Sequence, residues 1–184
     1  MVNLEEFLGK RVLIVGEVGS GKTRLLSKFL DYLIEQGYTH EITLIEMAPG
    51  LPDVGRRVED YTKNVDKVRY LKPEEIIPPR LFGRDRDEVL KYAEHNYREV
   101  KKLFEEFSRN PTEVLLVNDV TIFLHAGDPR EILKIIENCS TFAATAYEGI
   151  KLKDDKGSGV TQREKAGLEI LKKHMDLVIP LTKA

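Results

Sequence analysis

Eight consecutive residues decide the fold of this chain: Gly16-Glu17-Val18-Gly19-Ser20-Gly21-Lys22-Thr23. They match the pattern G-x-x-x-x-G-K-[ST] at each of its fixed positions. The mostly apolar residues 11–15 precede this segment, and apolar residues at three-and-four spacing follow it as far as Ile34. This order predicts a buried strand, a glycine-rich turn and an amphipathic helix that Gly37 ends.

The glycine-rich segment also predicts a site for a nucleoside triphosphate and Mg²⁺. Glycines let the backbone curl so that successive N–H groups face phosphates, and the following helix adds its positive N-terminal dipole. Lys22 is expected to reach the β and γ phosphates, and the Thr23 hydroxyl is expected to bind Mg²⁺. The residues expected to contact the nucleotide are Gly16, Glu17, Val18, Gly19, Ser20, Gly21, Lys22, Thr23 and Arg24.

Strands and helices alternate along the rest of the chain. Further strands are predicted at residues 42–46, 67–71, 114–117, 141–147 and 177–180, and a long helix at 85–108. Shorter helices are expected as a turn at 73–77, from Asp128-Pro129 onward, and from Thr161 to about Lys173, where Thr161 and Glu164 form a capping-box pattern. This order predicts a three-layer α/β/α sandwich with a mostly parallel sheet of about five strands. We expect residues 1–184 to form a single domain.

On these residues the chain resembles the P-loop NTPase superfamily, with Gly16 to Thr23 as the Walker A motif and Val114 to Asp119 as a candidate Walker B motif. The second motif is an apolar strand that ends in an aspartate holding Mg²⁺. The resemblance therefore implies that Thr23 and Asp119 bind the metal and that Lys22 and Asp119 are catalytic. The alternative is that Asp119 only caps the turn after a strand.

The residues around Asp119 do not support either of two large subclasses. Val120 follows Asp119, whereas AAA and RecA-type ATPases have an acidic residue at that place, and the switch GTPases continue as D-x-x-G. Guanine-binding members use an [NT]-K-x-D motif, and the nearest match, residues 152–155, reads Leu-Lys-Asp-Asp and lacks the leading Asn or Thr. ATP is therefore the favoured nucleotide, with GTP left open.

Further candidate residues lie beyond the ends of the predicted strands, where ligands gather in α/β folds. Glu46 ends the second strand and is a candidate catalytic group, the alternative being a structural carboxylate. The loop that contains Asp53, Arg56 and Arg57 is a candidate site for an anionic second substrate, unless its side chains are only solvated.

Three arginines follow a Pro-Pro pair and could act as a lid over phosphates, or could simply pair with Asp85 and Asp87. We favour ion pairing for this set, which comprises Arg80, Arg84 and Arg86.

Composition excludes several other classes of function. The chain has 184 residues, of which 41% are hydrophobic, and its net charge of -2 gives no overall electrostatic attraction to nucleic acid or anionic membrane, with a local basic patch left open. No apolar run reaches membrane-spanning length. The single cysteine fits a reducing compartment, and we expect a cytoplasmic protein. The four histidines show no paired metal-ligand spacing.

The sequence thus predicts Mg²⁺-dependent binding and hydrolysis of a nucleoside triphosphate. The alternatives are a small-molecule kinase and a regulatory module that binds a nucleotide with little turnover. Because Val120 is not acidic, we expect slow basal turnover. A protein partner is compatible with this sequence, but no motif identifies one. No motif predicts the acceptor, the oligomeric state or the order of the strands.

Overall fold

The structure is a computed structural model that describes residues 2–183. Its centre is a six-stranded sheet in the order β3-β2-β4-β5-β1-β6, and every pair of neighbouring strands runs parallel. The strands are β1 (Arg11–Gly16), β2 (Ile42–Glu46), β3 (Arg69–Leu71), β4 (Val114–Asn118), β5 (Thr141–Tyr147) and β6 (Leu177–Leu181). The predicted α/β sandwich is confirmed, and its sheet has six strands where about five were expected.

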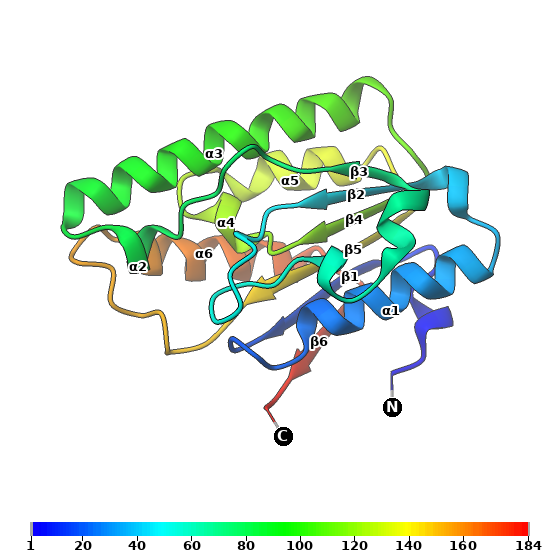
Figure 1. Cartoon of the computed structure of the whole chain (residues 1–184), viewed down its shortest axis with the longest axis horizontal. Coiled ribbons are helices and arrows are strands. Elements are labelled where there is room, and N and C mark those ends of the chain that lie inside the picture. The colour runs from blue at the N-terminus through cyan, green and yellow to red at the C-terminus, as the bar shows by residue number, and fades with distance from the viewer. Residues whose placement is uncertain (1, 184) are drawn as a thin grey trace.

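Helices cover both faces of the sheet (Figure 1). One face carries α1 (Lys22–Glu35), and the other carries α3 (Arg86–Arg109), α4 (Thr121–Leu124), α5 (Pro129–Ile136) and α6 (Val160–Lys173). The short α2 (Pro79–Phe82) precedes α3 and packs against it. Single 3₁₀ turns lie at Leu4–Phe7, Thr39–Glu41, Val58–Asp60 and Lys63–Lys67.

The alternation of side chains along buried strands explains how one sheet supports two cores. In β1, Val12 and Ile14 belong to the core beneath α1, whereas Leu13 and Val15 belong to the core beneath α3 to α6. Successive side chains of a strand point to opposite faces, so a continuous apolar run is what a sheet covered on both faces requires. None of the helices in residues 2–183 is long and apolar enough to cross a membrane.

Three local expectations were wrong. Residues 73–77 form no helix, and the helical turn begins instead at Pro79, because a proline fits the first position of a helix. The helix α4 was not predicted. The expected capping box at Thr161 and Glu164 is absent, since α6 begins at Val160 with Gly159 as its N-cap, and Glu164 is buried.

Candidate functional site

One cavity lies at the carboxyl ends of β1, β2, β4 and β5, where α/β folds place their ligands. Its volume is about 140 Å³. The Gly16–Thr23 segment, which we call the glycine loop, forms one wall, and α2 with the loop after β5 forms the opposite wall. The turn after β2 and the residues that follow β4 complete it.

The glycine loop ends in a set of unpaired hydrogen-bond donors. Gly21 is the N-cap of α1 with a φ of 96°, a backbone conformation that favours glycine. Within the part of the chain that the structure describes, the N–H groups of Gly21, Lys22 and Thr23 donate to no protein atom. The Ser20 hydroxyl is also buried without a partner. Such a helix start, with free N–H groups and a buried free hydroxyl, suits a bound anion.

Lys22 is held inside the glycine loop. Its Nζ donates to the carbonyl oxygen of Glu17 at 2.8 Å. Burial lowers the pKa of Lys22, and the nearby negative charges of Asp119 and Glu17 oppose that shift. The ammonium group therefore lies in a poorly solvated place and has only a backbone oxygen as its hydrogen-bond partner.

The Glu17 side chain ties the glycine loop to the loop after β5. Its carboxylate accepts hydrogen bonds from the backbone N–H of Ile150 at 2.9 Å and of Val18 at 3.1 Å. Burial would raise the pKa of Glu17, but the hydrogen bond from Ile150 and its neighbours hold it below its usual value. A Cβ added at Gly149 would clash with Glu17 Oε2, so a larger residue there would displace this carboxylate.

Asn118, the last residue of β4, is the centre of a polar network that sequence analysis missed. Its Oδ1 accepts hydrogen bonds from Thr23 Oγ1 at 3.2 Å and from Thr145 Oγ1 at 2.8 Å. Its Nδ2 donates to Glu46 Oε2 at 2.7 Å and to the Arg56 carbonyl oxygen at 3.0 Å. The strand residue that reaches Thr23 is therefore Asn118, one position before the aspartate that the sequence singled out.

Glu46 lies behind Asn118 and does not line the cavity. Its side chain is completely buried and accepts hydrogen bonds from Val58 N at 2.8 Å and Ala48 N at 3.2 Å. Burial raises the pKa of Glu46 to about 8. The hydrogen bonds that Glu46 accepts favour the ionised form and partly oppose this shift. Glu46 is therefore linked to the cavity lining only indirectly, to Ala48 by a hydrogen bond and to Thr23 through Asn118.

Asp119 lines the cavity next to Lys22. It has a φ of 63°, which is uncommon for a residue other than glycine. Its N–H donates to Thr145 Oγ1 at 2.7 Å, and its carboxylate accepts from the Thr121 hydroxyl. Burial raises the pKa of Asp119, while that hydrogen bond and the charge of Lys22 favour its ionised form.

The residues present fit a magnesium ion. Mg²⁺ in nucleotide sites uses one or two protein oxygens, with water and phosphate oxygens as its other ligands. The Thr23 hydroxyl and the Asp119 carboxylate both line the cavity and are oxygen donors of this kind. Residues 2–183 hold no group of three or more His, Cys, Asp or Glu side chains arranged around a metal position.

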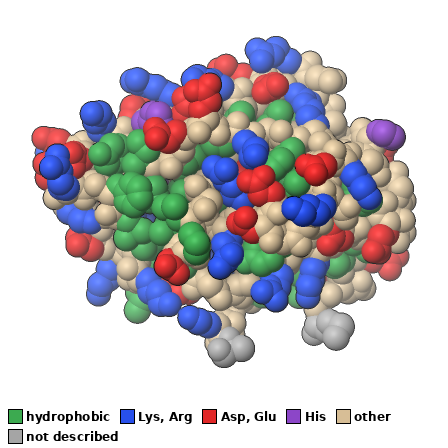
Figure 2. Space-filling view, viewed as in Figure 1, with side chains coloured by type: hydrophobic (Ala, Val, Ile, Leu, Met, Phe, Trp, Pro, Cys, Tyr) green, Lys and Arg blue, Asp and Glu red, His purple; other side chains and the backbone are tan. Residues whose placement is uncertain are grey.

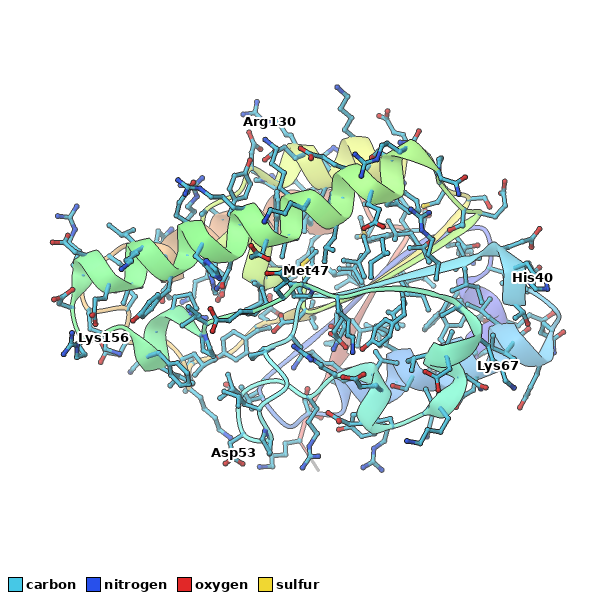
Figure 3. The ribbon with its side chains drawn as sticks, turned by 45° about the horizontal axis from the view of Figure 1, so that its top comes forward. His40, Met47, Asp53, Lys67, Arg130 and Lys156 are labelled. Atoms are coloured by element: carbon cyan, nitrogen blue, oxygen red, sulfur yellow. The ribbon has the colours of Figure 1, made fainter. Side chains whose placement is uncertain are left out.

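Of the residues predicted to bind a second substrate, only Arg56 lines the cavity. Arg57 is occupied elsewhere, because its Nε donates to the Ala48 carbonyl oxygen at 3.2 Å and its guanidinium lies 3.6 Å from Glu59. Asp53 lies at the outer end of its loop (Figure 3). Arg24 is exposed, and its guanidinium lies 5.5 Å from the ring centre of Tyr61.

The wall opposite the glycine loop contains a buried charged cluster that the sequence did not indicate. Arg80 from α2, His125 after α4 and Glu164 from α6 are each 5% exposed or less. Arg80 Nη2 donates to Glu164 Oε2 at 2.8 Å, and His125 Nε2 lies 2.6 Å from the same oxygen. We expected the arginines after the Pro-Pro pair to form ion pairs with Asp85 and Asp87. Arg80 pairs with Glu164 instead, and Arg84 pairs with Glu88 on the surface.

The segment that most resembles a guanine-binding motif has another role. Asp155 accepts hydrogen bonds from the N–H groups of Gly157 and Thr161 at 3.1 and 3.2 Å. Both of its carboxylate oxygens are thus used at the start of α6. Leu152 is the residue of this segment that lines the cavity.

A similar fold is found among solved structures. The chain matches the crystal structure of flagellar accessory protein FlaH from Methanocaldococcus jannaschii with a TM-score of 0.53 and 12% sequence identity. The match covers 94% of this chain and 71% of that chain. No protein-family model and no curated protein matches the sequence. The parallel sheet with helices on both faces and this likeness show a three-layer α/β fold similar to that of FlaH.

Proposed function

We propose that this chain binds a nucleoside triphosphate together with Mg²⁺, ATP in preference to GTP, and hydrolyses it slowly. One observation carries the proposal. The glycine loop presents free backbone N–H groups at Gly21, Lys22 and Thr23, together with the Lys22 side chain, at one end of a cavity. Phosphate groups supply acceptors for all of these donors, and Mg²⁺ bound by Thr23 and Asp119 would offset the negative charge.

Slow turnover follows from the residue that contacts Thr23. In the superfamily that the sequence resembles, a strand-ending aspartate stands there, whereas Asn118 is neutral. The anionic group nearest in sequence is Asp119, which already accepts a hydrogen bond from Thr121. We propose Asp119 as the carboxylate that holds Mg²⁺ or orients the attacking water, and Glu46 as a residue that positions Asn118.

Thermal unfolding with added nucleotide tests binding, because a ligand of the native state raises Tm. The wild type is measured with ATP, GTP and ADP, each with and without Mg²⁺, beside Lys22→Ala. Lys28→Ala is the matched control, since Lys28 is an exposed lysine on the same helix α1. We expect ATP with Mg²⁺ to raise Tm in the wild type and in Lys28→Ala but not in Lys22→Ala.

The proposal fails if no nucleotide shifts the wild type or if Lys22→Ala responds as the wild type does. Release of phosphate from ATP then tests hydrolysis in the same three proteins. Turnover well below 1–10³ s⁻¹, the usual range for enzymes, is expected for the wild type. Fast hydrolysis by the purified chain alone would contradict the role given to Asn118.

A second candidate is transfer of the phosphoryl group to a small acceptor. The observation in its favour is the apolar part of the cavity wall beyond Asp119, formed by Pro49, Pro79, Leu81 and Ile122. Such a wall suits the body of a small molecule. If hydrolysis is the reaction, free phosphate equals the ADP formed, whereas an excess of ADP over free phosphate in the presence of a metabolite mixture would identify a kinase.

A further inference from the structure

The buried cluster of Arg80, Glu164 and His125 faces the same cavity as the glycine loop. Arg80 makes a two-pronged pair with Glu164, with Nη1 at 3.3 Å from Oε1 and Nη2 at 2.8 Å from Oε2. Nη1 also donates to Thr161 Oγ1 at 3.0 Å. The guanidinium of Arg80 lies 5.7 Å from the ring centre of Tyr147. Its position is thus fixed by contacts with two other elements, α6 and β5.

Stability gives little reason to keep such a cluster. Removing two charges from water costs several kcal/mol per ion, and apolar pairs of the same volume often replace a buried ion pair without loss. Cavity walls are where buried charges serve ligands instead. The burial of the Arg80–Glu164 pair in a cavity wall is therefore what we expect where a charged side chain serves to bind a ligand.

Glu164 has a second partner besides Arg80, the imidazole of His125. His125 Nε2 lies 2.6 Å from Glu164 Oε2, the oxygen that also accepts from Arg80. If Arg80 turned away, Glu164 would keep His125 as its partner. The cost of leaving a buried carboxylate unpaired, which usually holds such pairs together, is therefore reduced.

Arg80 lies on the short helix α2, whose first two residues, Pro79 and Arg80, are buried and whose last two are exposed. Helix α2 has four residues, and Leu81 and Phe82 on it are 48% and 53% exposed. Figure 2 shows hydrophobic side chains gathered over the part of this face where α2 lies in Figure 1. The Arg80 carbonyl oxygen accepts from Lys156, which Figure 3 places beside α2. A long arginine side chain on this short helix can change partner without rearranging the sheet.

The terminal phosphate would lie on the Arg80 side of the cavity. Lysine at this place in the glycine loop reaches the β and γ phosphates, and Asp119 interacts electrostatically both with Lys22 and with Glu164 and His125 of the cluster. Besides Lys22, the lining cations are Arg56, which is exposed on its loop, and Arg80, which is buried. A planar guanidinium matches phosphate oxygens with two parallel hydrogen bonds.

We propose that Arg80 binds the terminal phosphate of the triphosphate, exchanging Glu164 for phosphate oxygens while His125 stays paired with Glu164. This rests on the proposed nucleotide binding. The chain would then distinguish a triphosphate from a diphosphate by a contact from its own α2. Helix α2 would be the element that reports the bound state, because Arg80 moves only when the third phosphate is present.

Calorimetric titration with ADP and with a non-hydrolysable ATP analogue, both with Mg²⁺, tests this. Arg80→Met should weaken binding of the analogue about 10- to 100-fold, the usual worth of charged hydrogen bonds, and leave ADP within about twofold. Glu164→Gln should tighten binding of the analogue several-fold, because the competing charge is gone. Arg84→Met is the matched control, since Arg84 pairs with Glu88 outside the cavity.

The double variant Arg80→Met/Glu164→Met guards against misfolding, because it removes both charges and keeps an apolar pair. It should show the same loss for the analogue as Arg80→Met. The proposal is overturned if Arg80→Met and the double variant fold and bind the analogue as the wild type does. It is also overturned, together with the proposed function, if the wild type binds neither nucleotide, and Lys22→Ala separates the two failures because it should lose ADP as well.

Discussion

The two walls of the cavity hold their charges in opposite ways. On the glycine loop, Lys22 has only a backbone oxygen as its acceptor, and the donors around it are free. On the opposite wall, Arg80 is fully paired with Glu164. One wall leaves its binding energy for a ligand, and the other satisfies its charges within the protein. The contrast teaches that, in the protein without a ligand, removing a charge should cost stability on the paired wall and little on the glycine loop.

The largest expected effect is on the paired wall. Glu164→Ala leaves Arg80 buried without a carboxylate and should lower the free energy of unfolding by about 3–5 kcal/mol. Lys22→Ala, on the open wall, should leave it nearly unchanged, because only one hydrogen bond to a backbone oxygen is lost. Denaturant unfolding of both variants measures this. Equal losses in the two would remove the contrast.

The network behind the glycine loop should give the next largest effect. Asn118→Ala removes the acceptor of the Thr23 and Thr145 hydroxyls and one of the donors to Glu46, at a cost of about 2–3 kcal/mol. Asn138→Ala is the control, since Asn138 is exposed. Denaturant unfolding of the two variants is compared. A loss in Asn118→Ala no greater than in the control would show that the network is not coupled to the fold.

A smaller effect is expected where Glu17 joins the two walls. Gly149→Ala would displace the Glu17 carboxylate from the Ile150 N–H and cost about 1–2 kcal/mol. In the double variant with Glu17→Ala the added Cβ has room, so the two costs should not add. A double-mutant cycle from unfolding curves checks this, and strict additivity would contradict the contact.

The last expected effect, from Glu46→Gln, is a change in how the free energy of unfolding depends on pH. Burial raises the pKa of Glu46 from 4.5 to about 8, so its contribution to stability is complete below about pH 4.5 and is lost as the pH rises toward 8. Glutamine stays neutral, so the variant should lack this fall. Unfolding free energies between pH 5 and about pH 8 are compared. Parallel profiles for the two proteins would mean that Glu46 is ionised throughout.

Sequence patterns predicted the elements whose burial is continuous. The strands 42–46 and 141–147 have the observed bounds because each is an unbroken buried run between residues that end strands. The long helix was predicted at 85–108 and found at Arg86–Arg109, with Asp85 as its N-cap. These features depend on neighbouring residues alone. The same holds for the turn and helix start that make the glycine loop.

Contacts between distant residues could not be predicted. Thr161 and Glu164 have the spacing of a capping box, yet Glu164 pairs with Arg80, which is 84 residues away. The motif pattern favours Asp119, whereas the residue that contacts Thr23 is Asn118, one position earlier. Asn118 lies opposite Glu46 on β2, and this pairing of distant residues makes it the last residue of β4. A single sequence carries no signal for either contact, because neither has a local spacing.

The place of β1 in the sheet has a consequence for how the molecule folds. β1 pairs with β5 and β6, and Arg11 N donates to Asp176 across 165 residues. Its first sequence neighbour in the sheet, β2, is separated from it by β4 and β5. Closing such long loops is entropically costly and slows folding. The strand that leads into the glycine loop can therefore pair only with residues that are synthesised long after it, so a nascent chain can form α1 well before it can complete the cavity.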